Sequence, residues 1–202
     1  MSYDEFKDIF SSEIGELSLI ETRYKLFSDT ISVIYKKQEK FYDELFKIRN
    51  DSELLKYIIN NFKYFDDYSE YKGKTIHFNK RAILLVNDLF YMSKTINKNI
   101  GNVNNMLGCA DYGIPRTLRT YGVLEYSDEL SEKVDNEIEI ESNSEIEVEI
   151  RANMLYALEL MKKKLKEAGK EINSVELDNL IWQMGRKKKN ILPYHHTTTI
   201  FY

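Results

Sequence analysis

The residues best suited to chemistry lie in the heptapeptide ADYGIPR at positions 110–116, which places a carboxylate, Asp111, beside an aromatic ring and ahead of a proline. Proline fixes its own φ and moves the preceding residue out of the α region. We therefore expect Asp111 on a rigid corner just before a helix that begins at Pro115. A carboxylate held in this way can face the positive charge that develops on a sugar as its glycosidic bond breaks. The alternative is that Asp111 only caps the helix.

A second set of charged residues lies in segment 80–90, which is otherwise almost entirely apolar. A helix of this composition is typical of a protein interior, so its charged side chains need partners or a cleft. Lys80 and Asp88 are eight residues apart, about two helical turns, and therefore share a face. Asp88 is either a salt-bridge partner or a group that orients Lys80. The alternative for Lys80 is an exposed lysine in a first helical turn.

Apolar residues at intervals of three and four predict that the elements around these residues are helices, so the expected fold class is all-α. The expected helical segments are 17–48, 52–59 capped by Ser52, 80–90 capped by Asn79, 115–121, a short helix capped by Ser127, 145–165, and a last helix capped by Asn173 and Ser174. Loops are expected at 66–74 and 97–105, a brief strand or extended entry at 75–78, and a solvated loop or frayed helix at 135–144. The tail from residue 192 ends in β-branched and aromatic residues and should pack against the body.

Composition limits the class of protein. The 202 residues fit one domain, and the single Cys109 excludes an internal disulfide framework. No run approaches the roughly 20 apolar residues of a membrane helix, so we expect a soluble, cytoplasmic protein without membrane contact. Three His and one Cys without paired spacing do not predict a metal site. The net charge of −4 argues against direct binding to nucleic acid, and the basic runs 162–164 and 186–189 are interpreted as solvated helix ends.

Seven fragments that occur in one order resemble the queuosine salvage family, the queuosine 5′-phosphate N-glycosidases. The fragments are FNKRA at 78–82, ADY and IP within 110–115, YGVLEYS at 121–127, EVEIR at 147–151, EINS at 171–174, Leu177-Asp178 with Trp182, and PYH at 193–195 before the closing IFY. The resemblance covers about residues 72–202. It divides one compact domain into an N-terminal helical region, 1–70, with a weak match, and a catalytic helical region, 71–202.

The resemblance implies a fold similar to that of helix-hairpin-helix DNA glycosylases. It also implies hydrolysis of the N-glycosidic bond of queuosine 5′-monophosphate, or a related 7-deazaguanine nucleotide, which releases queuine for reuse in tRNA modification without a metal or organic cofactor. The family's functional Asp and Lys fall on Asp111 and Lys80. Asp111 would stabilise the oxocarbenium-like sugar and orient or deprotonate water, or else form a covalent intermediate. Lys80 would assist the leaving base or neutralise the phosphate.

Further residues are expected to bind the substrate. Tyr112 and Trp182 could stack on the base, although a lone Trp in a helix stripe is often part of a core. His195 could meet the phosphate or be a packed tail imidazole. Glu149 and Arg151 are two residues apart on one helix, so one should face the substrate and the other a structural partner. Asp178 and Asp88 complete the expected set of substrate-binding residues.

The sequence departs from the family pattern at four positions. Gly113 and Arg116 stand where the family commonly has Arg and Gln, Gln183 stands where it often has Asp, and His196 replaces an Arg. These changes concern the contacts to the base and the phosphate more than the type of bond. Together with the shorter N-terminal region, they motivate an alternative, a non-catalytic nucleotide- or RNA-binding module on the same scaffold. A DNA-lesion glycosylase is a third hypothesis, which the acidic net charge disfavours.

Overall fold

The computed structural model describes residues 1–98 and 100–202, without the side chain of Glu39. The described chain is mostly helical. Its helices are α1 (Tyr3–Ile9), α2 (Ile20–Lys37), α3 (Glu39–Leu45), α4 (Asp51–Asn61), the 3₁₀ turn η1 (Lys63–Phe65), α5 (Lys80–Thr95), α6 (Gly113–Thr120), α7 (Asp128–Asp135), α8 (Glu145–Glu167) and α9 (Ser174–Lys187). Two short antiparallel hairpins accompany them, β1 (Ser11–Ser12) with β2 (Gly15–Glu16) and β3 (Tyr68–Tyr71) with β4 (Lys74–His77).

The β3–β4 hairpin partly corrects the expected all-α fold. The brief strand expected at 75–78 is confirmed as β4, but segment 66–74, expected to be a loop, contains strand β3. Tyr68 pairs with His77 and Tyr71 with Lys74. The turn residues Lys72 and Gly73 both have positive φ, 48° and 74°, as the tight turn of a two-residue hairpin requires. The sequence did not indicate β3, because β3 and its partner β4 both lie in one short, mostly polar segment without a strong strand pattern.

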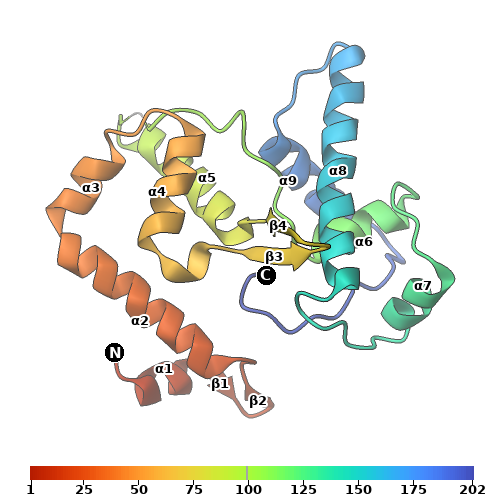
Figure 1. Ribbon diagram of the computed structural model, residues 1–202, viewed down its shortest axis with the longest axis horizontal. Coiled ribbons are helices and arrows are strands. Elements are labelled where there is room, and N and C mark those ends of the chain that lie inside the picture. Colours follow the sequence, from red (N-terminus) through yellow and green to blue (C-terminus); the bar gives the residue numbers. More distant parts are fainter. Residues whose placement is uncertain (99) are drawn as a thin grey trace.

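The two larger of three hydrophobic cores divide most helices into two lobes, with the β3–β4 hairpin between them (Figure 1). The first core joins α3, α4, α5 and the loop after α5, and it includes Leu45, Leu54, Ile58, Val86 and Met106. The second joins α6, α8 and α9, and it includes Ile114, Leu118, Met154, Leu158 and Leu177. Phe78, just before α5, is fully buried in the second core. This residue therefore fixes the start of α5 against the other lobe.

Several expected helix starts are confirmed by their caps. Ser127 accepts from Leu130 N at the start of α7, Ser144 caps α8, and Asn173 forms a capping box at the start of α9. Such caps satisfy backbone N–H groups that have no partner within the helix. The helix expected at 17–48 is divided at Gln38, whose φ is 47°. In the loop expected at 97–105, Asn99 lies outside the described residues.

Three details differ from the expectation. Helix α4 begins at Asp51 and is capped by Asn50, which accepts from Glu53 N, and not by Ser52. The side chain of Asn79 does not cap α5. Helix α5 is not buried all round, because Leu84 is 39% exposed. Only one face of α5 therefore packs in the core, and its other face is available to line a pocket.

The C-terminal tail packs against the body, as expected, and it ends between the two lobes (Figure 1). Arg23 of α2 donates to the Thr199 carbonyl at 3.3 Å, and Arg81 of α5 donates to the Ile200 carbonyl at 3.4 Å. The loop expected at 135–144 contacts the tail, because Ile140 N donates to the His196 carbonyl at 2.7 Å. Among the helices of the described chain, none combines the length and the apolar character that crossing a bilayer requires.

Candidate active site

Lys80 is positioned by Asp67, a fully buried carboxylate just before β3. The Asp67 carbonyl accepts from Phe78 N at 2.8 Å and from Asn79 N at 3.1 Å, and Asp67 Oδ2 accepts from Lys80 N at 3.4 Å. Asn79 Oδ1 in turn accepts from Asp67 N. These bonds satisfy N–H groups at the start of α5 and favour the helix dipole. The backbone of Lys80 is therefore fixed from outside its own helix.

Arg151 connects the start of α5 to the segment that carries Asp111. Its guanidinium binds both carboxylate oxygens of Asp67, with Nη1 to Oδ1 at 3.1 Å, while Nε donates to the Ala110 carbonyl at 3.2 Å. Its Cζ lies 3.9 Å from the centroid of the Phe78 ring. Arg151 is only 1% exposed, so it lies in the interior and not on a cavity wall. Its contacts position the two lobes against each other rather than presenting the guanidinium to a substrate.

Asp111 is half-buried directly before α6. Its Oδ1 accepts from Gly113 N at 2.8 Å and Ile114 N at 3.0 Å, so α6 begins at Gly113 and not at Pro115 as expected. One carboxylate oxygen therefore caps the helix, while Oδ2 has no hydrogen bond among the described contacts. A side chain at 113 would begin 3.6 Å from Trp182 Cδ1 and 3.7 Å from Asp111 Oδ1. Glycine leaves that space between ring and carboxylate open.

Asp178 of α9 is the second carboxylate of the site. It is 8% exposed, and its Oδ1 accepts from Cys109 N at 3.1 Å, two residues before Asp111. Burial, and then the negative charge of Asp111, raise the pKa of Asp178 to about 7, against the opposing effect of Lys80. Burial, followed by Asp178, also raises the pKa of the Cys109 thiol. Asp111, Asp178 and Lys80 thus lie close enough to act on one another electrostatically.

A pocket of about 380 Å³ opens beside Lys80 between α5, α2 and the tail. Lys80 and Asp88 both line it, as their spacing predicted. The other lining residues are Arg23, Phe65, Arg81, Leu84, Leu85, Ile200, Phe201 and Tyr202. Three cations and one carboxylate make this pocket suited to an anion. Burial, and then the nearby Arg23, lower the pKa of Arg81, which indicates that an anion would relieve the repulsion between the two guanidiniums.

A smaller cleft of about 150 Å³ lies on the other side of Tyr202, lined also by Tyr112, Tyr194, His195, His196 and Thr197. The ring centroids of Tyr112 and Tyr194 are 5.1 Å apart in an edge arrangement. His195 is 2% exposed, and burial, with the charge of Arg151, lowers its pKa to about 4. Its Nδ1 is buried without a hydrogen-bond partner among the described residues. His195 is therefore a neutral imidazole at the cleft wall.

Five expected residues line neither of these cavities, namely Asp111, Asp178, Glu149, Arg151 and Trp182. Glu149 is exposed on the opposite side of α8 from Arg151, where Tyr71 donates to its carboxylate and Lys72 Nζ lies 3.7 Å away. The expectation that the two residues face different sides is thus met, but neither lines the Lys80 pocket. Trp182 is 44% exposed on α9, beside Arg186. It is a surface ring next to Gly113 and not a core residue.

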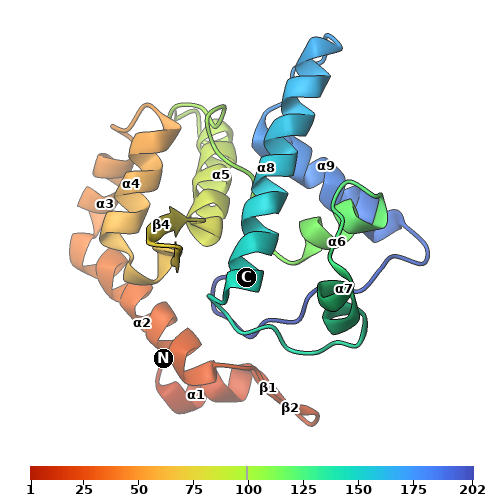
Figure 2. The same cartoon turned by 45° about the vertical axis from the view of Figure 1, so that its right-hand side comes forward.

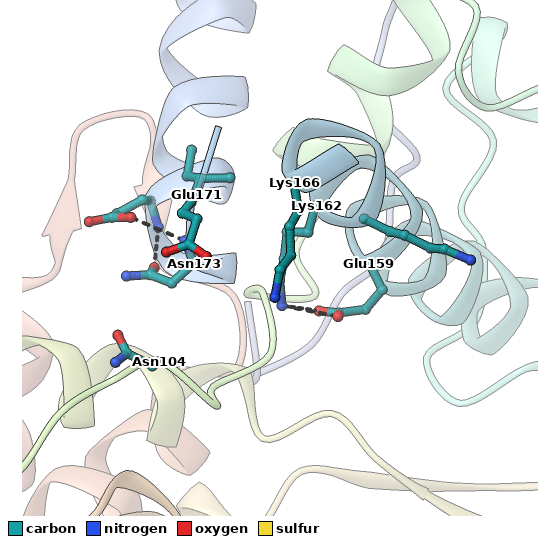
Figure 3. Close-up of a pocket in the computed structure, with 9 residues that line it drawn as sticks. Asn104, Glu159, Lys162, Lys166, Glu171 and Asn173 are labelled. Atoms are coloured by element: carbon teal, nitrogen blue, oxygen red, sulfur yellow. Dashed lines mark hydrogen bonds and ion pairs between the residues drawn. The ribbon is translucent and has the colours of Figure 1, made fainter. Parts of the chain in front are cut away.

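A larger groove of about 630 Å³ lies elsewhere, between the end of α8 and the start of α9 (Figure 3). Its charges are paired or balanced. Lys162 Nζ contacts Glu159 at 2.9 Å and donates to Ser174 Oγ at 2.6 Å, while Lys166 and Glu171 face each other across the gap (Figure 3). It contains none of the residues that were expected to be catalytic or to bind the substrate. Volume alone therefore does not identify the site.

Sequence reasoning missed four residues that shape the site, namely Asp67, Arg23, Arg81 and Tyr202. Tyr202 O–H donates to Glu147 Oε1 at 2.8 Å, and Tyr202 lines both cavities. Glu147 is 1% exposed and lies 3.5 Å from Arg151 Nη1. Arg81 and Tyr202 lie in the matched fragments FNKRA and IFY, but no pattern in the sequence gave them a role.

Comparison with known proteins identifies the family of the chain. A family model described as queuosine salvage protein matches residues 1–202. The queuosine 5′-phosphate N-glycosylase/hydrolase of Sphaerobacter thermophilus is 31% identical over 205 residues, which cover 98% of this chain and 62% of the relative. Those of Dictyostelium discoideum (36% over 154 residues, 75% and 48%) and Mus musculus (31% over 221 residues, 100% and 64%) are also similar. The chain spans less than two thirds of the length of these relatives. It belongs to the queuosine salvage protein family.

Proposed function

We propose that the chain hydrolyses the N-glycosidic bond of queuosine 5′-monophosphate, or of a closely related 7-deazaguanine nucleotide. The products are the free base, queuine, and ribose 5-phosphate. The observation that carries the proposal is that Lys80, Asp111 and Asp178 come from different segments yet share one electrostatic environment, held by the buried Arg151. The family membership and the names of the relatives support the same reaction.

Asp111 acts on the sugar. As the bond between C1′ and the base nitrogen breaks, its electron pair moves to the base and positive charge develops on the ribose. Asp111 is kept in place through Oδ1 by two backbone N–H groups, while Oδ2 remains to stabilise that charge and to orient the attacking water. The water oxygen bonds to C1′ and its proton passes to the carboxylate and then to solvent.

The base must receive a proton or hydrogen bonds on departure. A 7-deazapurine has carbon in place of N7, so that position cannot be protonated. Asp178, with a pKa of about 7, carries a proton about half of the time near neutral pH and can share it with a polar edge of the base. Side chains of the protein therefore supply the proton to the base and the charge that stabilises the sugar.

The substrate's phosphate fits the Lys80 pocket, where Arg23, Lys80 and Arg81 meet. The aromatic cleft of Tyr112 and Tyr194 fits a flat base. We also infer a scaffold of the helix-hairpin-helix glycosylase type, which is supported by the mostly helical fold and the family resemblance. A cytoplasmic location is supported by the single, buried Cys109.

The test is chromatography of queuosine 5′-monophosphate and of queuosine after incubation with the purified protein. Asp111→Asn is the sharpest variant, because the amide oxygen can still accept from Gly113 N and Ile114 N while the negative charge is lost. We expect its kcat/KM to fall at least about a hundredfold. Asp128→Asn, an exposed acid in the first turn of α7, serves as the matched control and should retain activity. Absence of base release by the wild-type protein would favour a non-catalytic binding module.

A further inference from the structure

One part of the molecule lacks acidic residues although the whole chain is acidic. Segments 112–124 and 179–202 contain six Lys and Arg residues and no Asp or Glu, whereas the other 165 residues hold 23 of the 29 basic residues and all 33 acidic ones. The two segments adjoin in space, because α6 packs on α9 (Figure 2) and Leu192 N donates to Thr120 Oγ1 at 3.2 Å. The net charge of −4 therefore does not describe these two segments, which together are positively charged.

Aromatic rings are exposed on the same surface. Tyr112, Tyr121, Trp182 and Tyr194 are each between 44% and 46% exposed. On α9, Leu177 and Ile181 are buried whereas Leu180 is 47% exposed. We define the α6–α9 face by Tyr112, Arg116, Tyr121, Trp182, Arg186 and Lys188. It extends from beside Asp111 along the eight residues of α6, a length of about 12 Å at the usual helical rise.

Three of these four rings are accompanied by a cation. Arg116 Cζ lies 4.7 Å from the centroid of Tyr194, Arg186 Cζ lies 4.9 Å from that of Trp182, and Lys188 Nζ lies 5.1 Å from that of Tyr121. Among the described residues, none of these three cations forms an ion pair with a carboxylate. The only paired cation of the two segments is Arg119, which binds Asp135.

Arg116 carries a second, independent sign of a missing partner. Its Nε is buried and has no hydrogen-bond acceptor within the described part of the chain. A buried guanidinium N–H without an acceptor is costly, and a phosphate oxygen would satisfy it.

We propose that the α6–α9 face binds single-stranded RNA. Alternating exposed rings and unpaired cations are what an unpaired strand requires, because bases stack on the rings while phosphates meet the cations. A duplex hides its bases and cannot use the rings in this way. The expectation that direct nucleic-acid binding is absent depended on the net charge of the chain, which does not describe this face.

The binding face is inferred independently of the proposed hydrolysis. The choice of RNA over DNA does rest on the proposed function, because the proposed substrate is a ribonucleotide. The face begins at Tyr112, whose neighbour Asp111 is the proposed catalytic group. Binding and hydrolysis are measured separately, by fluorescence and by base release. A failure of one therefore does not imply a failure of the other.

Trp182 provides a direct probe because it is the single Trp of the chain and lies on the face. We would titrate the full chain with an oligouridylate 10-mer at 50 mM salt and follow Trp emission, then repeat with a base-free polyphosphate of similar charge and with duplex RNA. The test variant is Tyr121→Ala/Arg186→Ala/Lys188→Ala, all exposed positions. The matched control is Lys163→Ala/Lys166→Ala on α8, which removes the same number of charges at the groove of Figure 3.

We expect the 10-mer to quench Trp182, and the test variant to bind at least about tenfold more weakly, since stacking is worth about 1–3 kcal/mol per base. The control should change affinity less than about twofold. No quenching at 100 µM oligomer, or equal binding of polyphosphate, would overturn the proposal. Equal binding of duplex, or an equal loss in the control variant, would also overturn it.

Discussion

Replacing Arg151 with methionine tests whether one buried guanidinium holds the two lobes and the candidate site together. Met has a similar length and keeps the apolar contact with Phe78, but it removes the counter-charge of Asp67, whose side chain is 0% exposed. Breaking a buried ion pair at one partner costs about 3–5 kcal/mol, because a buried charge is left uncompensated. For a domain of this size, the expected fall in Tm is about 6–20 °C.

The matched control is Arg119→Met. Arg119 also binds both oxygens of an aspartate, Asp135, with contacts at 2.6 and 2.9 Å. The side chain of Asp135 is 46% exposed, so solvent can replace the lost partner and the expected cost is at most about 1 kcal/mol. The two variants therefore differ mainly in the burial of the carboxylate that is left behind.

The assay is urea unfolding of the wild type, the two single variants, Asp67→Asn and Asp67→Asn/Arg151→Met. The double variant should recover part of the loss, because no buried charge remains without a partner. The deficit of Arg151→Met should also shrink as the pH falls from 8 to 5. Glu147 would then take up a proton in the folded state, because burial already raises its pKa in the wild type. A cost no larger than that of Arg119→Met, or no recovery in the double variant, would refute the role given to Arg151.

Two further predictions concern the titrating groups. In Asp178→Asn the buried acid is lost, while Cys109 N keeps a hydrogen-bond acceptor. Because the pKa of Asp178 is raised to about 7, the wild type loses stability as the pH rises from about 4 to 7. The variant should therefore be a few kcal/mol more stable than the wild type at pH 8 but slower in base release, and equal stability at pH 8 would contradict this. His195→Gln removes an imidazole whose pKa is lowered to about 4. The free energy of unfolding of the wild type should fall by about 2–3 kcal/mol between pH 6.5 and 4, and that of the variant should not. Acid titrations followed by circular dichroism would measure the difference, and parallel curves would exclude this role of His195.

The sequence by itself determined most of the helices, because helix starts are local. Ser127, Ser144 and Asn173 each accept from a backbone N–H only three residues away. The same locality placed Asp111 at the corner before α6, whose first two N–H groups it binds. Strand β3 was not predicted, because a two-stranded hairpin depends mainly on its turn and contains few residues with a strong preference for strands.

Only the tertiary structure decided what each charged residue does. Spacing showed that Glu149 and Arg151 face different sides of α8, but not that Arg151 is interior and bound to Asp67, 84 residues earlier in the chain. Arg23 reaches the tail across 176 positions, and Tyr202 reaches Glu147 across 55. Contacts of this kind depend on how two cores pack, which no local pattern encodes. The separation of charge onto the α6–α9 face likewise arises only when segments distant in the chain fold together.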